Sequence, residues 1–148
     1  MITVQDMMTP NPLTLSRYNS LHDARKLMQQ NRFRHVPIVD DTHQLIGLVT
    51  QRNVLSHGLS SQDFIDSEEL KKIETGTLLA DIMTSEITTV TADMKIDDAA
   101  QLIYKKKFGC LPVVDENYQL VGIITDHDFV AMTMQLLDMM NVLENEAD

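Results

Sequence analysis

Cysteine, positive charge and long apolar runs are all scarce in this chain of 148 residues. Its single cysteine, Cys110, cannot form a disulfide within the chain. The first residues carry neither the basic region nor the apolar run of a secretory signal. The most apolar stretch, residues 129–143, is broken by Gln135, Asp138 and Asn141, and it falls short of the roughly 20 residues that cross a bilayer. We therefore expect a reducing, cytoplasmic setting and no membrane partner.

Lysine and arginine number 12 against 22 aspartates and glutamates, which gives a net charge of −10 at pH 7. A general nucleic-acid surface needs clustered cations that neutralise phosphates, so we expect no nucleic-acid partner. A small anion is still compatible with this charge. The two basic clusters, Lys105 to Lys107 and Arg32 with Arg34, precede matching apolar segments. For the lysines we favour a role at a helix end, where cations interact well with the C-terminal dipole.

Catalytic signatures are missing too. The chain has no glycine-rich dinucleotide or phosphate loop and no nucleophile elbow. Its five histidines do not have the spacing that would build a zinc site with Cys110. We therefore predict that the chain is not an enzyme, that it has no catalytic residues or catalytic cofactor, and that it has no metal site.

The chain does have an internal repeat with a constant offset of 75 residues. Three segments recur: DMMT at 6–9 returns as DIMT at 81–84, VPIVD at 36–40 as LPVVD at 111–115, and LIGLVT at 45–50 as LVGIIT at 120–125. The copies extend through nearly the whole length, so the repeat unit is the architecture. We predict a first repeat at residues 1–55, a linker at 56–78 that is helical over 68–74, a second repeat at 79–134, and a C-terminal helix extension with an acidic tail at 135–148.

Each repeat has the pattern of a mixed unit of strands and helices. In the first, apolar residues at helical spacing from Leu21 to Met28 follow Ser20, and Asp23 completes a capping box. Two short β-branched runs follow, which predict paired strands, and the chain then returns to helix. With an entering strand at residues 13–15, the order is strand, helix, strand, strand, helix. The fold class is therefore α/β (α+β).

The apolar stripe of the C-terminal segment is wider than one helix face. Phe129, Met132, Leu136 and Met140 share one side, and further apolar residues such as Val130 broaden it. We predict a helix buried on two sides, one against this chain and one against a second copy, which gives a homodimer. The alternative is an intramolecular core with a few exposed methionines.

The junctions that follow the second paired strand hold candidate ligand groups. GLVTQRN at 47–53 and GIITDHD at 122–128 each have a strand glycine, a junction threonine, and Asn53 or Asp128 three residues later. A helix cap alone accounts for this pattern, because Thr-x-x-Asp is a near capping box. The functional interpretation is a helix N-terminus that binds phosphate, an acidic side chain that accepts a ribose diol, and a glycine that allows a ligand to approach closely. The presence of the arrangement in both copies favours the functional interpretation.

The D-x-M-T openings, the h-P-h-V-D strands and the G-h-h-T-x-x-D/N junctions together resemble the cystathionine-β-synthase (CBS) domain family, over residues 1–55 and 79–134. The resemblance implies a tandem pair, or Bateman module, of two βαββα repeats packed about a pseudo-twofold axis with two clefts. It also implies a regulatory, energy-sensing module that binds AMP, ADP, ATP or another adenosyl compound between the repeats and signals to an unidentified regulated protein. S-adenosylmethionine, NAD or a divalent cation stay open as ligands.

The resemblance further implies roles for the residues at matching positions. Phosphate contacts fall to Thr50 and Thr125, and ribose contacts to Asn53 and Asp128. The strands that line the clefts are represented by Thr14, Leu15, Thr89 and Val90, and the segments that cradle the base by His35, Val36, Pro37, Cys110, Leu111 and Pro112. Arg34, Arg52 and His127 complete the nucleotide-binding candidates, although Arg52 and His127 are equally explained as ordinary first-turn surface residues.

The two clefts should differ. Asn53 has one acceptor oxygen where the family's stronger sites have aspartate, so we expect Asp128 to make the better ribose site. Arg34 or Arg52 would supply positive charge for a polyphosphate, whereas Asp126 would oppose phosphate. The alternative to a sensor is a ligand-free dimerisation or scaffold module, in which both Thr-x-x-Asp/Asn motifs are only helix caps.

Overall fold

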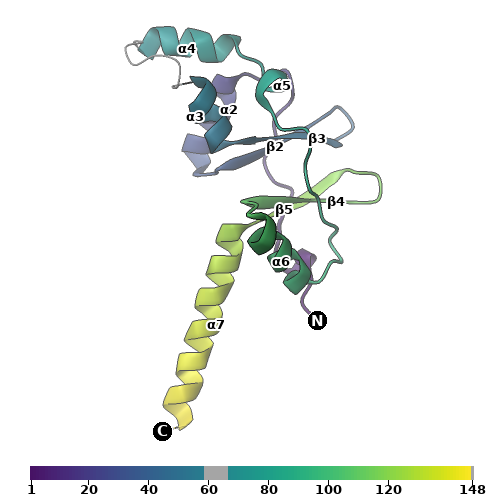
Figure 1. Cartoon of the computed structure of the whole chain (residues 1–148), viewed down its shortest axis with the longest axis vertical. Helices are drawn as coiled ribbons and strands as arrows, with labels where there is room; N and C mark the ends of the chain where they lie inside the picture. The colour runs from purple at the N-terminus through teal and green to yellow at the C-terminus, as the bar shows by residue number, and fades with distance from the viewer. Residues whose placement is uncertain (59–66, 148) are drawn as a thin grey trace.

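The computed structural model describes residues 1–58 and 67–147, which form two halves stacked along one long axis (Figure 1). The strands form a three-stranded sheet in the order β1-β5-β4 and a two-stranded sheet, β2-β3. In chain order the elements are α1 (Val4–Met7), β1 (Thr9–Pro10), α2 (Leu21–Asn31), β2 (His35–Val39), β3 (Leu45–Thr50), α3 (Gln51–Gly58), α4 (Ser67–Gly76), α5 (Leu79–Ile82), α6 (Ile96–Lys106), β4 (Cys110–Val114), β5 (Leu120–Thr125) and α7 (Asp126–Ala147). This is the mixed α+β class that the sequence predicts.

The first half confirms the predicted helix start and hairpin. The Asp23 N–H donates to Ser20 Oγ at 3.1 Å and the Ser20 N–H donates to Asp23 Oδ2 at 2.9 Å, so α2 begins with the expected capping box. The turn between β2 and β3 is held by Asp40, whose Oδ1 accepts from the Thr42 N–H at 2.9 Å. At the matching start of α6, Lys95 makes no side-chain cap. Both hairpins, β2–β3 and β4–β5, are antiparallel.

Gln44 and its repeat equivalent Gln119 pair with each other at the junction between the halves. Gln44 Nε2 donates to the Asn117 carbonyl at 2.8 Å, and Gln119 Nε2 donates to the Thr42 carbonyl at 2.8 Å. Equivalent residues thus make equivalent bonds in both directions. The two repeats are therefore related by a pseudo-twofold axis, as the resemblance implies.

The opening segment of each repeat packs on the other repeat. Strand β1 pairs with β5, with Thr9 opposite Ile123, and Thr84 pairs in the same antiparallel sense with Leu48. Burial follows the same exchange, because Val4 of α1 lies in the core of the second half whereas the buried residues of α5 lie in the core of the first. Each core therefore contains a piece of both repeats.

Two strand glycines are covered by methionines of these exchanged segments. A Cβ added to Gly47 would meet Met83 Sδ, and one added to Gly122 would meet Met8 Sδ and lie 3.1 Å from the Thr9 carbonyl oxygen. A glycine inside a strand leaves space for close approach of another segment. That space was predicted to admit a ligand, and this was wrong, because protein atoms occupy it.

The entering strand predicted at residues 13–15 is reduced to one residue. Leu15 forms a single parallel bridge to β2, and Val90 forms the equivalent bridge to β4. A turn follows at once, closed in the first half by a hydrogen bond to the Ser16 carbonyl oxygen. Because of this turn, the segment cannot form further bridges to β2.

The linker predicted at residues 56–78 is helical in α4, as expected for residues 68–74. Glu74 of α4 is 2% exposed, and Arg25 Nε of α2 donates to its two carboxylate oxygens at 2.5 Å and 3.0 Å. The Leu21 N–H also donates to the Thr77 carbonyl at 2.8 Å. The described part of the linker is therefore an integral part of the first half, and residues 59–66 lie outside the described residues.

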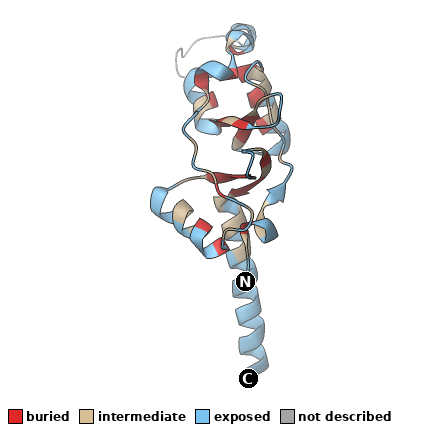
Figure 2. Ribbon diagram, turned by 90° about the vertical axis from the view of Figure 1, so that its right-hand side faces the viewer, coloured by how far each residue is buried: buried red, intermediate tan, exposed pale blue. Residues whose placement is uncertain are grey.

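Helix α7 extends for 22 residues away from the two sheets and is exposed over most of its length (Figure 2). Phe129 packs against the core of the second half and Met132 is half-buried, but every described residue from Thr133 onward is exposed. The prediction that one side of this helix packs within the chain was wrong beyond its second turn, because the helix points away from both cores. None of the helices among residues 1–58 and 67–147 is long and apolar enough to span a membrane.

Candidate functional site

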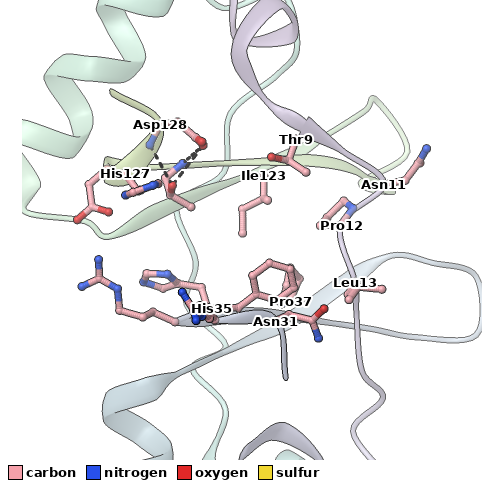
Figure 3. A pocket seen from close by; sticks show the side chains of 15 residues that line it. Thr9, Asn11, Pro12, Leu13, Asn31, His35, Pro37, Ile123, His127 and Asp128 are labelled. Atoms are coloured by element: carbon pink, nitrogen blue, oxygen red, sulfur yellow. Dashed lines mark hydrogen bonds between the residues drawn. The ribbon is translucent and has the colours of Figure 1, made fainter. Parts of the chain in front are cut away.

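A cleft of about 670 Å³ lies between the two halves, beside the N-terminus of α7 (Figure 3). Its upper wall in this view comes from β5 and the first turn of α7. Its lower wall comes from β2 and the end of α2, and residues 9–13 close one side. The volume lies within the range of about 300–1,000 Å³ that small-molecule sites occupy.

The upper wall carries Thr125, Asp126, His127 and Asp128, where β5 passes into α7. The Thr125 N–H donates to Asp128 Oδ2 at 2.8 Å, and the Asp128 N–H donates to Thr125 Oγ1 at 3.3 Å. This is the reciprocal cap that the sequence pattern allows. It uses one carboxylate oxygen only, since Oδ1 has no hydrogen-bond partner among the described residues. Asp128 can therefore cap the helix and still accept hydrogen bonds from a ligand.

The lower wall carries Arg34, His35 and Pro37 from the first repeat. Because side chains alternate along a strand, Val36 between them points into the first core, whereas Pro37, which is also below 2% exposed, lies on the side of the cleft. Burial lowers the pKa of His35 below its ordinary value; the charge of Asp126 opposes this effect, and the charge of Arg34 adds to it. His35 is therefore neutral at pH 7 and offers one donor and one acceptor nitrogen.

The side of the cleft is closed by Asn11, Pro12 and Leu13, next to Thr9 of β1. The Asn11 N–H donates to the Val121 carbonyl at 3.2 Å, which holds this segment against β5. Sequence reasoning missed this side and further lining residues: Thr9, Asn11, Pro12, Leu13, Asn31, Arg32, Phe33 and Ile123. The available signal was the pair Pro10 and Pro12, because proline fixes φ; Asn11 between them has a left-handed φ of 47°, so the segment turns there.

Six of the predicted site residues meet in this cleft: Arg34, His35, Pro37, Thr125, His127 and Asp128. The remaining candidates do not line it: Thr14, Leu15, Val36, Thr50, Arg52, Asn53, Thr89, Val90, Cys110, Leu111 and Pro112. Val36, Val90 and Leu111 are members of the two cores. The cleft thus combines the second repeat's junction with the first repeat's strand.

Thr50 and Asn53 form the equivalent cap at the start of α3. The Thr50 N–H donates to Asn53 Oδ1 at 2.9 Å, and the Asn53 N–H donates to Thr50 Oγ1 at 3.1 Å. An amide has a single acceptor oxygen, so Asn53 commits its acceptor to the cap. In β4, Cys110 is 6% exposed, and burial together with the nearby Asp126 charge raises the pKa of its thiol to about 12. The thiol therefore stays protonated and packs as an apolar group.

The cleft combines apolar surface with charges of both signs. Ile123 of the upper wall faces Pro37 of the lower wall, with Leu13 at the side (Figure 3), while Arg34 and Asp126 contribute opposite charges. Such a cleft can hold a flat apolar group, a polar diol and an anion at different points. Within residues 1–58 and 67–147, no group of three or more histidine, cysteine, aspartate or glutamate side chains could hold a metal ion.

Residues 4–60 and 79–133 match the family model described as the CBS domain. The chain therefore belongs to the CBS domain family and carries the domain twice. The repeat, the exchanged openings and the cleft between the halves are consistent with this assignment.

Three similar proteins extend the comparison. The CBS domain-containing protein CBSX2 of Arabidopsis thaliana, a chloroplastic protein, is 31% identical over 90% of this chain and 64% of its own length. A crystal structure of CBSX2 in complex with AMP is 29% identical, covers 91% of this chain and 98% of that chain, and superposes with a TM-score of 0.77. A structure from Vibrio cholerae that is described as an acetoin utilization protein (AcuB) is 40% identical, covers 95% and 96% of the two chains, and has a TM-score of 0.79.

This chain is shorter than its curated relatives. It spans 64% of the length of CBSX2 and 23% of the length of relatives named as homoserine O-acetyltransferase and inosine-5'-monophosphate dehydrogenase. The similarity to those enzymes covers only their CBS part.

Proposed function

We propose that this chain is a regulatory module that binds an adenosine-containing ligand, with AMP as the reference compound, in the cleft between its repeats. The observation that carries the proposal is the meeting of Thr125 and Asp128 from the second repeat with Arg34 and His35 from the first in one cleft of about 670 Å³. The AMP complex of CBSX2 supports the choice of ligand class.

Each part of the nucleotide has a candidate partner. The adenine ring would pack between Ile123 and Pro37, where neutral His35 can both donate and accept a hydrogen bond. The ribose diol would donate to Oδ1 of Asp128, the oxygen that the helix cap does not use. Oδ1 suits this role because one carboxylate oxygen has two lone pairs and can accept from both hydroxyls, and because hydrogen bonds to a charged acceptor are strong.

The phosphate would lie at the N-terminus of α7, where the helix dipole favours an anion, although the N–H groups of Thr125, Asp126 and Asp128 already donate within the protein. Arg34 adds positive charge on the opposite wall, and Asp126 opposes it. Because the charges of Arg34 and Asp126 act in opposite directions, the affinity of the site should depend on the number of phosphates. ADP and ATP are therefore candidates beside AMP. S-adenosylmethionine and NAD share the adenosine part and belong to the same class.

Regulation would follow from the position of the cleft. A ligand that touches both repeats can change their relative orientation, but only by as much as its affinity differs between the two arrangements. The output would pass to a separate, unidentified protein, and we propose no catalytic activity for the chain. The cytoplasmic, reducing setting stays a prediction from the sequence.

Calorimetric titration of nucleotide-stripped protein with AMP, ADP, ATP, S-adenosylmethionine and NAD tests the proposal. We expect saturable binding of at least one of them. The Asp128→Asn variant keeps an acceptor for the cap but loses the charge, so it should bind about tenfold more weakly, as the loss of a charge-assisted hydrogen bond predicts. Absence of binding for all five compounds would contradict the proposal and favour the ligand-free scaffold.

A further inference from the structure

Helix α7 presents an apolar face that nothing in the described chain covers (Figure 2). Six large apolar side chains on it are each 50% to 64% exposed: Val130, Leu136, Leu137, Met139, Met140 and Leu143. Together they expose on the order of 650 Å², which approaches the roughly 800 Å² that each partner contributes to a standard stable interface. A patch of this size exceeds what monomeric proteins ordinarily leave open to water.

The spacing of the central row of this face is that of a coiled coil. The exposed residues Thr133, Leu136, Met140 and Leu143 follow Phe129, which packs on the core of the second half, at alternating intervals of four and three residues. This heptad spacing keeps one seam facing a partner helix along its whole length. An irregular partner surface would not require such a repeat.

The distribution of charge on α7 permits contact with an identical helix. The positions that flank the central row are apolar through most of the helix, with Val130 and Leu137 on one side and Met132 and Met139 on the other. Asp138 lies on the opposite row, between Met134 and Val142, and the glutamates that flank the central row come only in the last turns, at Glu144 and Glu146. Two copies can therefore meet over residues 129–143 of this seam without like charges between them, despite the net charge of −10.

We propose that α7 pairs with α7 of a second copy of this chain through this heptad row, which we call the α7 seam. A twofold pair suits the seam because a symmetric interface uses the same patch on both partners. The methionines on and beside the row supply side chains that adapt to an imperfect fit. This interaction does not depend on the nucleotide proposal, since the seam lies beyond the cleft.

The mass of the full chain in solution tests the proposal, measured by sedimentation velocity at about 50 µM. The wild type should sediment as a dimer or as a higher assembly of the same chain. The double variant Leu136→Asp/Met140→Asp should be monomeric, because it places charges in the seam. It should keep the wild-type circular dichroism and AMP titration, since the substituted residues lie outside both cores. Tyr104→Asp, on the 85% exposed Tyr104 of α6, serves as the control and should leave the mass unchanged. A monomeric wild type, or a double variant that still assembles, would overturn the proposal.

Cysteine crosslinking tests the position of the α7 seam, and its result does not depend on how tightly the two copies associate. Native Cys110 is buried and its thiol pKa is raised to about 12, so it gives little background under mild oxidation. Leu136→Cys lies in the middle of the seam and should form a disulfide-linked dimer, whereas Asp138→Cys, on the opposite row, should not exceed the wild type. Equal crosslinking of the two variants, or none in either, would show that α7 does not pair along this face.

Discussion

Asp128 caps the helix that follows Thr125 with one carboxylate oxygen, at 2.8 Å from the Thr125 nitrogen, while its other oxygen has no partner among the described residues. Asn53 makes the same cap for Thr50 at 2.9 Å, but an amide has no second acceptor oxygen. Two side chains with the same structural role therefore differ in what they can offer a ligand.

Alanine at these two positions should separate capping from binding. Asp128→Ala and Asn53→Ala should each lower the free energy of unfolding by about 1 kcal/mol, since each removes a helix cap. Only Asp128→Ala should weaken AMP binding, by about tenfold or more. Urea unfolding and calorimetry on the same samples measure both effects. Equal losses of AMP affinity in the two variants would refute the asymmetry.

The exchanged methionine contacts predict an unequal response to glycine substitution. Gly122→Ala should destabilise the protein by about 1–3 kcal/mol, because its Cβ meets Met8 and the Thr9 carbonyl in a packed interface. Gly76→Ala is the matched control, since a Cβ there has no neighbour within 4 Å. We expect Gly76→Ala to be neutral or slightly stabilising. Thermal unfolding of both variants measures the two effects on stability. A Gly122→Ala variant as stable as the wild type would argue against the exchange of opening segments.

The ion pair between Arg25 and Glu74 predicts that α4 contributes to the stability of the first half. Glu74→Met should lower the free energy of unfolding by about 2 kcal/mol, because it leaves the Arg25 charge largely buried without a partner. The cost is below that of a fully buried pair, since Arg25 is 19% exposed. The double variant Arg25→Met/Glu74→Met should recover part of the loss. Additive effects in urea unfolding would mean that the two side chains are not coupled.

Much of this architecture was predictable from the sequence, because its signals are local. The Ser20–Asp23 box, the Asp40 turn and the two hairpins each depend on residues that are close in the chain. The internal repeat likewise needs no tertiary information. The exchange of opening segments was not predictable, because Met8 and Met83 occupy equivalent places and a repeat does not indicate which copy each one covers.

Only parts of the candidate site could be predicted from the sequence. The Thr125–Asp128 junction and the His35 strand carried recognisable patterns, but only the fold shows that they line one cleft. Residues 9–13 were missed because the segment has neither helical nor strand periodicity. The width of the α7 stripe was visible, yet its complete exposure beyond Thr133 depends on the direction in which the helix leaves the sheet.

The buried His35 predicts a pH effect on stability near neutrality. Its folded pKa lies below the unfolded value of about 6.5. As the pH falls below about 6.5 the unfolded chain gains a proton that the folded chain resists, so stability should fall toward acid. Unfolding free energies measured from pH 7.5 to pH 5.5 should decline less steeply in His35→Asn than in the wild type. An unchanged slope would mean that His35 protonates equally in both states. The lowered pKa values of Asp23 and Asp40 act in a separate, more acidic range.

A crystal structure of the wild-type chain with AMP tests the central claim most directly. The account predicts one AMP in the cleft between the repeats, with its ribose hydroxyls on Asp128 and its base between Ile123 and Pro37. AMP bound at the Thr50–Asn53 junction instead, or at a surface outside the cleft, would contradict it.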